Sequence, residues 1–138
     1  MLKDLIYPQK ICFVHIPKCG GTFIGSLLKK QYSMKKFIKT SKSVNINAKV
    51  SSDTALFFNE DTQFLRNRLV YYFLKKGKLD FCEGHIALHR DVLAHFVSSW
   101  KFVALLRDPV SRFFSQYFYA RNKISNHAKT YLDLDDWL

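Results

Sequence analysis

The sequence has few of the residues that build metal sites, disulfide frameworks or membrane spans. Its three cysteines, Cys12, Cys19 and Cys82, form no Cys-x-x-Cys pair and have no metal-ligand spacing beside histidines. No stretch approaches ~20 uninterrupted apolar residues, and residues 1–10 lack the basic start and apolar core of a signal peptide. We therefore expect a soluble chain without structural zinc, in a reducing compartment.

Acidic residues are also scarce. The chain has 11 Asp and Glu against 22 Lys and Arg, a formal net charge of +11 at pH 7. Such a charge concentrates anions near the protein, although the lysines that follow the first predicted helix are equally typical of a solvated face. A nucleic-acid module would fit the charge, but no helix-turn-helix, zinc-finger or RNA-binding signature is present, so we expect no specific nucleic-acid partner.

Length and pattern predict a single α/β domain over residues 1–138. A hydrophobic fraction of 48% suffices for one modest core. Apolar runs predict strands at 11–16, 36–40, 79–82 and 101–106, and helical periodicity predicts helices at 22–31, 60–76, 91–96 and 110–122. Residues 42–53, rich in Ser, Asn and Lys, read as a loop. Strands that alternate with helices favour a parallel sheet covered on both faces.

The segment FVHIPKCGGT, residues 13–22, has the pattern of a buried strand, a glycine turn and a helix start. Gly20 and Gly21 permit a tight turn, and the unpaired N–H groups of the helix start face any anion lying there. Lys18 adds a positive charge and Thr22 a hydroxyl donor. The lysine precedes the glycines, so this is not a Walker A loop. The pattern predicts a phosphate cradle, with a plain strand-turn-helix as the alternative.

A second segment has the same organisation. The apolar run 102–106 is typical of a central parallel strand, and it ends in Arg107-Asp108-Pro109 before a helix. Asp108 suits the N-cap and Pro109 the first helical turn. Arg107 at the strand end and Ser115 two turns along the helix could both reach one anion. Alternatively, Arg107 pairs with Asp108 or caps a carbonyl, and Ser115 is a hydroxyl on the helix surface. The helix also carries aromatic residues at the spacing of a buried stripe: Phe113, Phe114, Tyr117 and Phe118.

These two segments together resemble the sulfotransferases that use 3′-phosphoadenosine 5′-phosphosulfate (PAPS). HIPKCGGT is similar to the 5′-phosphosulfate loop of their carbohydrate-modifying, heparan-sulfate 2-O-sulfotransferase-like branch, with Cys19 in place of a threonine, and LRDPVSRFFSQY is similar to their 3′-phosphate motif. The resemblance implies a P-loop-like sulfotransferase fold and a metal-free enzyme that sulfates a hydroxyl, with a glycan as the acceptor. The residues it assigns to the donor are Lys18, Cys19, Gly20, Gly21, Thr22, Phe23, Arg107 and Ser115.

Transfer to a hydroxyl requires a base near the acceptor and positive charge near the leaving phosphate, for which Lys18 is suited. Histidine titrates nearest neutral pH, and His85 follows a predicted strand within a Gly-His element similar to that of glycosaminoglycan-modifying members. Some of those carry a second histidine where this chain has Glu83, so Glu83 could orient His85, act as base itself or be structural. The other histidines fit less well: His15 inside the first strand, His89 and His95 beside a short helix, and His127 outside any motif.

The resemblance covers about the amino-terminal half of a typical family domain, so we expect either a fragment or a minimal member. It implies a cytoplasmic protein if the source is bacterial or viral, and a Golgi protein only if a membrane anchor lies outside this sequence. Two alternatives stay open. One is a P-loop-like nucleotide kinase or phosphatase, which magnesium dependence would reveal, and the other is a non-catalytic binder of PAPS or of sulfated polymers.

Overall fold

The computed structural model describes residues 9–34, 42–123 and 129–137, which form a parallel sheet flanked by helices. The strands are β1 (Ile11–Val14), β2 (Ser43–Ile46), β3 (Phe81–Gly84) and β4 (Lys101–Ala104), in the order β2-β3-β1-β4. The helices are α2 (Gly21–Met34), α3 (Ala48–Phe57), α4 (Thr62–Lys75), α5 (Arg90–Phe96), α6 (Pro109–Arg121) and α7 (Leu134–Trp137). This confirms the predicted α/β class and parallel sheet.

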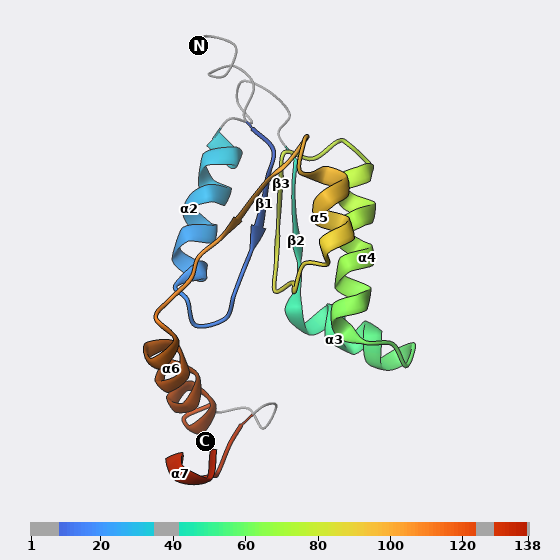
Figure 1. The fold of residues 1–138 in the computed structure, drawn as a ribbon. Helices are drawn as coiled ribbons and strands as arrows, with labels where there is room; N and C mark the ends of the chain where they lie inside the picture. The colour runs from blue at the N-terminus through green and yellow to red at the C-terminus, as the bar shows by residue number, and fades with distance from the viewer. Residues whose placement is uncertain (1–8, 35–41, 124–128, 138) are drawn as a thin grey trace.

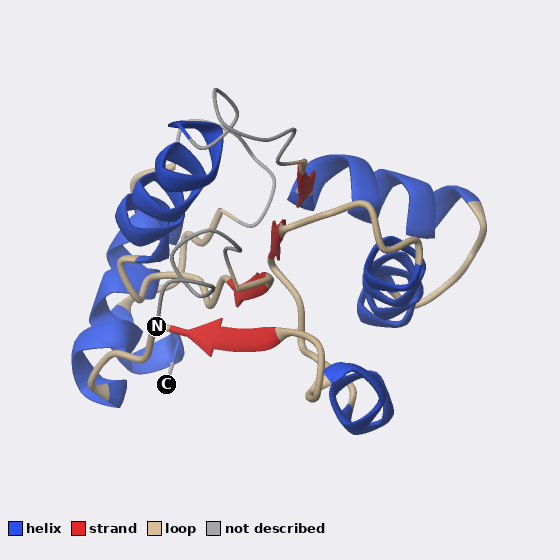
Figure 2. Ribbon diagram, turned by 90° about the horizontal axis from the view of Figure 1, so that it is seen from above, coloured by secondary structure: helices blue, strands red, loops and turns tan. Residues whose placement is uncertain are grey.

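Helices lie on both faces of the sheet (Figures 1 and 2). Side chains alternate between the faces along each strand, so Cys12 and Phe13 point into different cores. On one face Phe13 and Phe81 pack with Tyr32 of α2. On the other face the strands pack against α4 and α5, in a cluster of the buried residues Cys12, Ile46, Val70, Leu74, Cys82, Ile86, Phe96 and Trp100.

The sheet brings three loops to one edge. β1 pairs in parallel with β3 on one side and with β4 on the other, and all of these strands end level, at Val14, Gly84 and Ala104. The segments that follow them therefore leave the same edge of the sheet. In α/β sheets ligands bind at this carboxyl edge, and here it receives both sequence motifs and His85.

The prediction of a loop over 42–53 was wrong. This segment contains β2 and the first part of α3, with the Asn47 side chain capping α3 by accepting a hydrogen bond from the Val50 N–H. β2 is four residues long and α3 buries only Ser51 and Ala55, so neither element carries a hydrophobic pattern strong enough to detect. The strand predicted at 36–40 lies outside the described residues.

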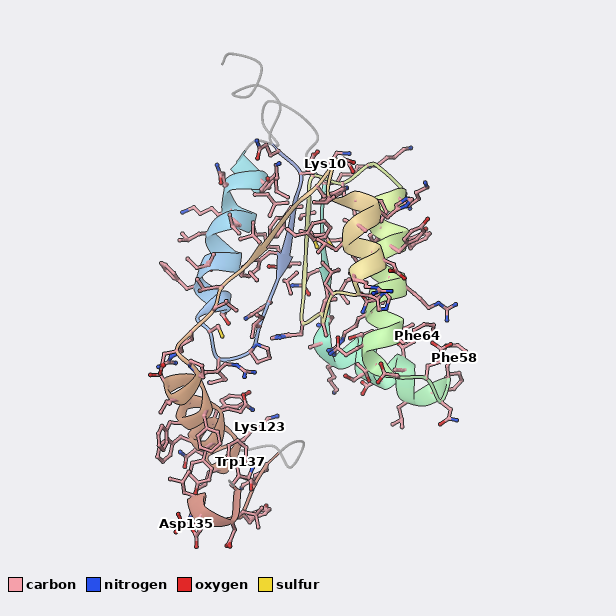
Figure 3. All side chains as sticks on the ribbon, viewed as in Figure 1. Lys10, Phe58, Phe64, Lys123, Asp135 and Trp137 are labelled. Atoms are coloured by element: carbon pink, nitrogen blue, oxygen red, sulfur yellow. The ribbon has the colours of Figure 1, made fainter. Side chains whose placement is uncertain are left out.

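Two further expectations need correction. β4 is an edge strand of the described sheet, not a central one, because no described strand pairs beyond it. Along α6 the predicted buried stripe holds only in part, since Tyr117 is buried but Phe114 and Phe118 are 40% and 54% exposed. The reason is the position of α6, which extends beyond the carboxyl edge and meets Trp137 of α7, as Figures 1 and 3 show.

The described helices are too short or too polar to cross a bilayer. The longest, α2 and α4, have 14 residues each. A span needs about 20 apolar residues in succession.

Candidate active site

The loop between β1 and α2 makes a tight turn at the carboxyl edge. Lys18 and Gly20 have positive φ angles of 64° and 79°, which is costly for the lysine because it carries a Cβ. A Cβ on Gly21 would lie 2.3 Å from Cδ2 and 2.6 Å from Nε2 of His15, so the start of α2 approaches that ring as only glycine can. The first N–H groups of a helix have no partner within it, and those of α2 lie at this turn.

The side chains of the loop divide between the interior and the solvent. Cys19 is 5% exposed, so its thiol is enclosed and an anion in the turn would meet only its backbone. Thr22 is exposed, as is Phe23 at 66%. The segment therefore offers backbone N–H groups, the Thr22 hydroxyl and the Lys18 amine to a ligand.

The second motif docks on this loop. Arg107 Nη1 donates to the carbonyl of Lys18 at 3.4 Å, and Arg112 Nε donates to the carbonyl of Pro17 at 3.1 Å. The Lys18 amine lies 4.2 Å from the ring centroid of Tyr119 in α6, a cation–π contact. Segments some 90 residues apart in the chain thus share one site, with guanidinium groups at its border.

The start of α6 has the predicted form. Asp108 is the N-cap, and its Oδ2 accepts a hydrogen bond from the Ser111 N–H at 2.8 Å. Hydrogen bonds from Ser111 also lower the pKa of the Asp108 carboxyl. Pro109 is the first helical residue, and Ser115 lies half-buried in the second turn. β4 ends at Ala104, so Arg107 lies three residues beyond the strand rather than at its end as predicted, directly before the Asp108 cap.

His85 follows β3 directly and is half-buried. Its ring stacks on that of His15, with centroids 4.3 Å apart and an interplanar angle of 24°. Burial lowers the pKa of His85, and the neighbouring His15 and Arg66 lower it further, against an opposing hydrogen bond to the His15 backbone. His85 Nδ1 is buried without a hydrogen-bond partner among the described residues. These effects favour the neutral form of the imidazole, which is the form that can accept a proton.

His15 lies just past β1 rather than inside it, because the strand ends at Val14. Its backbone N–H still donates to the Gly84 carbonyl at 2.9 Å, which fixes the ring between Gly21 and His85. His15 thus limits how closely the start of α2 can approach the end of β1. His89 and His95 are both exposed, and the side chain of His89 caps α5. His127 lies outside the described residues.

Glu83 is buried, at 8% exposed, on the α2 side of the sheet. Its Oε1 accepts a hydrogen bond from Asn45 Nδ2 at 2.6 Å and lies 3.7 Å from the Lys29 amine. These groups line a hollow of about 370 Å³ that also receives Gly21, Thr22 and the two stacked histidines. The described contacts of the carboxylate are with Asn45 and Lys29, so they favour the structural reading of Glu83 over that of a group orienting His85.

A larger cleft of about 700 Å³ lies on the other side of His85. Its lining residues are Pro17, Ala48, Lys49, Ser52, Asp53, Arg66, His85 and Lys123. His85 is common to the cleft and to the hollow beside the loop. It is thus the titratable group between the predicted donor loop and an open space large enough for an acceptor.

Sequence reasoning missed several residues of the site. Arg112 and Tyr119 hold the loop, Asn45 and Lys29 hold Glu83, and Arg66 reaches the backbone of His85. Only Arg112 carried a signal, since it lies inside the second motif. In the part of the chain that the structure describes, no group of three or more His, Cys, Asp and Glu residues is placed to hold a metal ion.

The sequence matches one family model over nearly its whole length. Residues 7–135 match the model described as Sulfotransferase family. Comparison with curated proteins gives no match. Comparison with solved structures gives none either.

Proposed function

Because this chain belongs to the sulfotransferase family, we propose that it transfers a sulfuryl group from PAPS to an acceptor hydroxyl, with a carbohydrate as the acceptor class. The observation that carries the proposal is the contact of Arg107 with the Lys18 carbonyl, at 3.4 Å. It joins the loop suited to one phosphate with the motif suited to another. A donor with phosphate at both its 5′ and 3′ positions needs such a pair of anion sites.

The chain's residues fit such a donor. Backbone N–H groups of Gly20, Gly21 and Thr22 would hold the 5′-phosphosulfate, because N–H groups at a helix start bind phosphate and the two glycines carry no side chain there. Arg107 and Ser115 would hold the 3′-phosphate from α6 and its cap. Bound PAPS would supply a sulfuryl group already activated by its phosphate.

His85 would act as base. Its neutral imidazole lines the cleft and would take the proton from the acceptor hydroxyl as the oxygen attacks sulfur. The Lys18 amine lies on Tyr119 in this structure and would turn toward the phosphate oxygen on which negative charge develops. A lysine side chain has the length and rotamer freedom for that movement.

Calorimetry with 3′-phosphoadenosine 5′-phosphate, the desulfonated product, tests the donor site without knowledge of the acceptor. We expect binding without metal, weakening as salt rises. Arg107→Ala should lose one charge-assisted contact, roughly 1.5–3 kcal/mol of binding free energy. The matched control is Arg90→Ala, because Arg90 is 92% exposed on α5 and away from the loop; its affinity should match that of the wild type.

Two results would contradict the donor assignment. Equal affinity of the wild type for adenosine 5′-phosphate would show that no 3′-phosphate site exists. Binding that requires magnesium would favour a nucleotide kinase or phosphatase. Incubation with PAPS and a panel of glycans, read out as radiolabelled sulfate on the glycan, then tests transfer itself.

A further inference from the structure

One face of α4 holds the segment that carries His85, residues 85–89. Gln63 Oε1 accepts a hydrogen bond from the Ala87 N–H at 2.8 Å. Asn67 Nδ2 donates to the Ala87 carbonyl at 2.8 Å, and its Oδ1 accepts from the His89 N–H at 2.7 Å. Residues four apart share a face of a helix, so the two side-chain amides both reach this segment. They hydrogen-bond its backbone groups, as the backbone of a neighbouring strand would.

Arg66, which lies between Gln63 and Asn67 in the sequence, contacts His85 itself. Its Nη1 donates to the His85 carbonyl at 2.8 Å. Its Nε donates to Ser51 Oγ at 2.9 Å, and its Nη2 donates to the Ala48 carbonyl at 2.9 Å and to Ser52 Oγ at 3.1 Å. A single guanidinium group therefore joins His85 to the first turn of α3, which forms a wall of the cleft.

Burial of this charge is energetically costly. Arg66 is 7% exposed, and burial lowers the pKa of its guanidinium. All four acceptors named above are neutral oxygens, which offset the desolvation of a cation less well than a carboxylate does. An apolar side chain would fill the same space at lower cost. A buried arginine here is therefore better explained by what it holds in place than by packing alone.

We infer that Arg66 is a positioning residue: it fixes the backbone of His85 and so the direction of the imidazole into the cleft. The inference rests on the proposed function, in which His85 is the base. Proton transfer depends on geometry, and a displacement of about 1 Å can cost on the order of 10²-fold in rate. The stacked ring of His15 restrains His85 from the other side.

Several charged or titratable groups face His85 in addition to Arg66. They are His15 after β1, Lys49 and Asp53 of α3, and Lys123 after α6, with Glu83 and Lys29 in the adjoining hollow. Arg66 is the group among these that also bonds the His85 backbone. Two variants separate the effect of its charge from that of its hydrogen bonds. Arg66→Lys keeps the charge but loses the planar set of guanidinium donors, whereas Arg66→Gln loses both.

The test combines sulfuryl transfer with an NMR titration of His85 in the full chain. Arg66→Lys should lower transfer at least tenfold while the titration midpoint of His85 stays near that of the wild type. Arg66→Gln should lower transfer as much and also move the midpoint upward, toward the ordinary value near 6.5. The control is Arg68→Gln, which removes an exposed arginine of α4 that pairs with Glu60 before the helix; it should change neither quantity.

Asn67→Ala separates positioning from stability, because it loosens residues 87–89 without touching His85. Thermal unfolding and product-nucleotide affinity show which variants are folded. If Arg66→Gln does not fold, the transfer rate of Arg66→Lys alone tests the inference. The inference is overturned if both Arg66 variants transfer at the wild-type rate. It is also overturned if Asn67→Ala, at the same loss of stability as an Arg66 variant, reduces transfer as much as that variant does. Should the wild type sulfate no acceptor, the proposed function fails, and the His85 resonances in Arg66→Lys still decide: unchanged shifts refute positioning.

Discussion

Gly21→Ala tests how closely the donor loop, His15 and His85 are packed. The new Cβ would lie 2.3 Å from His15 Cδ2, whereas carbon atoms in contact are about 3.5–4.0 Å apart. The ring cannot simply retreat, because it stacks on His85 at 4.3 Å and its backbone N–H is bonded to Gly84. Either the ring must rotate or the start of α2 must move outward.

The expected magnitude follows from two opposing effects. Overpacking of this kind typically costs about 1–3 kcal/mol. Alanine is a better helix former than glycine by at most about 1 kcal/mol, and less at the first position of a helix. Overpacking therefore exceeds propensity, and Gly21→Ala should lower the free energy of unfolding by about 1–2 kcal/mol. Affinity for 3′-phosphoadenosine 5′-phosphate should fall as well, because the N–H groups of the turn move.

Urea denaturation measures the first quantity and calorimetry the second. Gln31→Ala, an exposed substitution further along the same helix and outside the hollow beside the loop, is the control and should have little effect on nucleotide affinity. The decisive variant is His15→Ala combined with Gly21→Ala. Removal of the ring should relieve the overlap, so the cost of Gly21→Ala should shrink in that background. A cost that is the same in both backgrounds would refute the reasoning.

The remaining predictions concern individual side chains of the site. His85→Ala should leave affinity for the product nucleotide nearly unchanged while the transfer rate falls by roughly 10²–10⁴-fold. A normal transfer rate would exclude His85 as the base and leave Glu83 as the candidate. Lys18→Ala should reduce both quantities in the same assays, because the amine serves the bound donor and the transition state. Asn45→Ala should lower the free energy of unfolding in urea by about 1–3 kcal/mol, since the buried Glu83 carboxylate loses a hydrogen bond of 2.6 Å; an unchanged midpoint would contradict this. Burial lowers the pKa of His85 in the folded state, so stability should be full above pH 6.5 and fall as the pH drops below it, and His85→Ala should flatten that slope.

The motifs could be predicted because their information is local. The glycine turn and the Asp108 cap are each encoded within a few neighbouring residues, and the structure has both where the sequence indicates. β1 and β4 begin at the predicted residues but end two residues earlier. The exposure of Phe114 and Phe118 could not be predicted in this way. A helical stripe indicates which residues share a face, but it does not say which element, if any, covers that face.

The residues that hold the site in place could not be predicted from the sequence either, because their contacts join residues far apart in the chain. Arg66 reads as one of several basic residues on an amphipathic helix, and its bonds to Ser51 and His85 span 15 and 19 residues. Asn45 lies in a segment whose polar composition indicated a loop, yet β2 pairs with β3 and places it opposite Glu83. Burial of polar groups depends on partners that a single sequence does not reveal.

The buried cysteines give the molecule its own reporters of opening. Cys12 and Cys82 lie opposite each other on β1 and β3 with no exposed surface, and a hydrogen bond between the thiols and burial raise the pKa of Cys82. Reagents that attack thiolates can reach them only when the sheet itself comes apart. Cys19 is enclosed in the turn between β1 and α2, so a local opening of the loop suffices to expose it. Its labelling rate, compared with that of the sheet pair, therefore measures how often the loop opens independently of global unfolding.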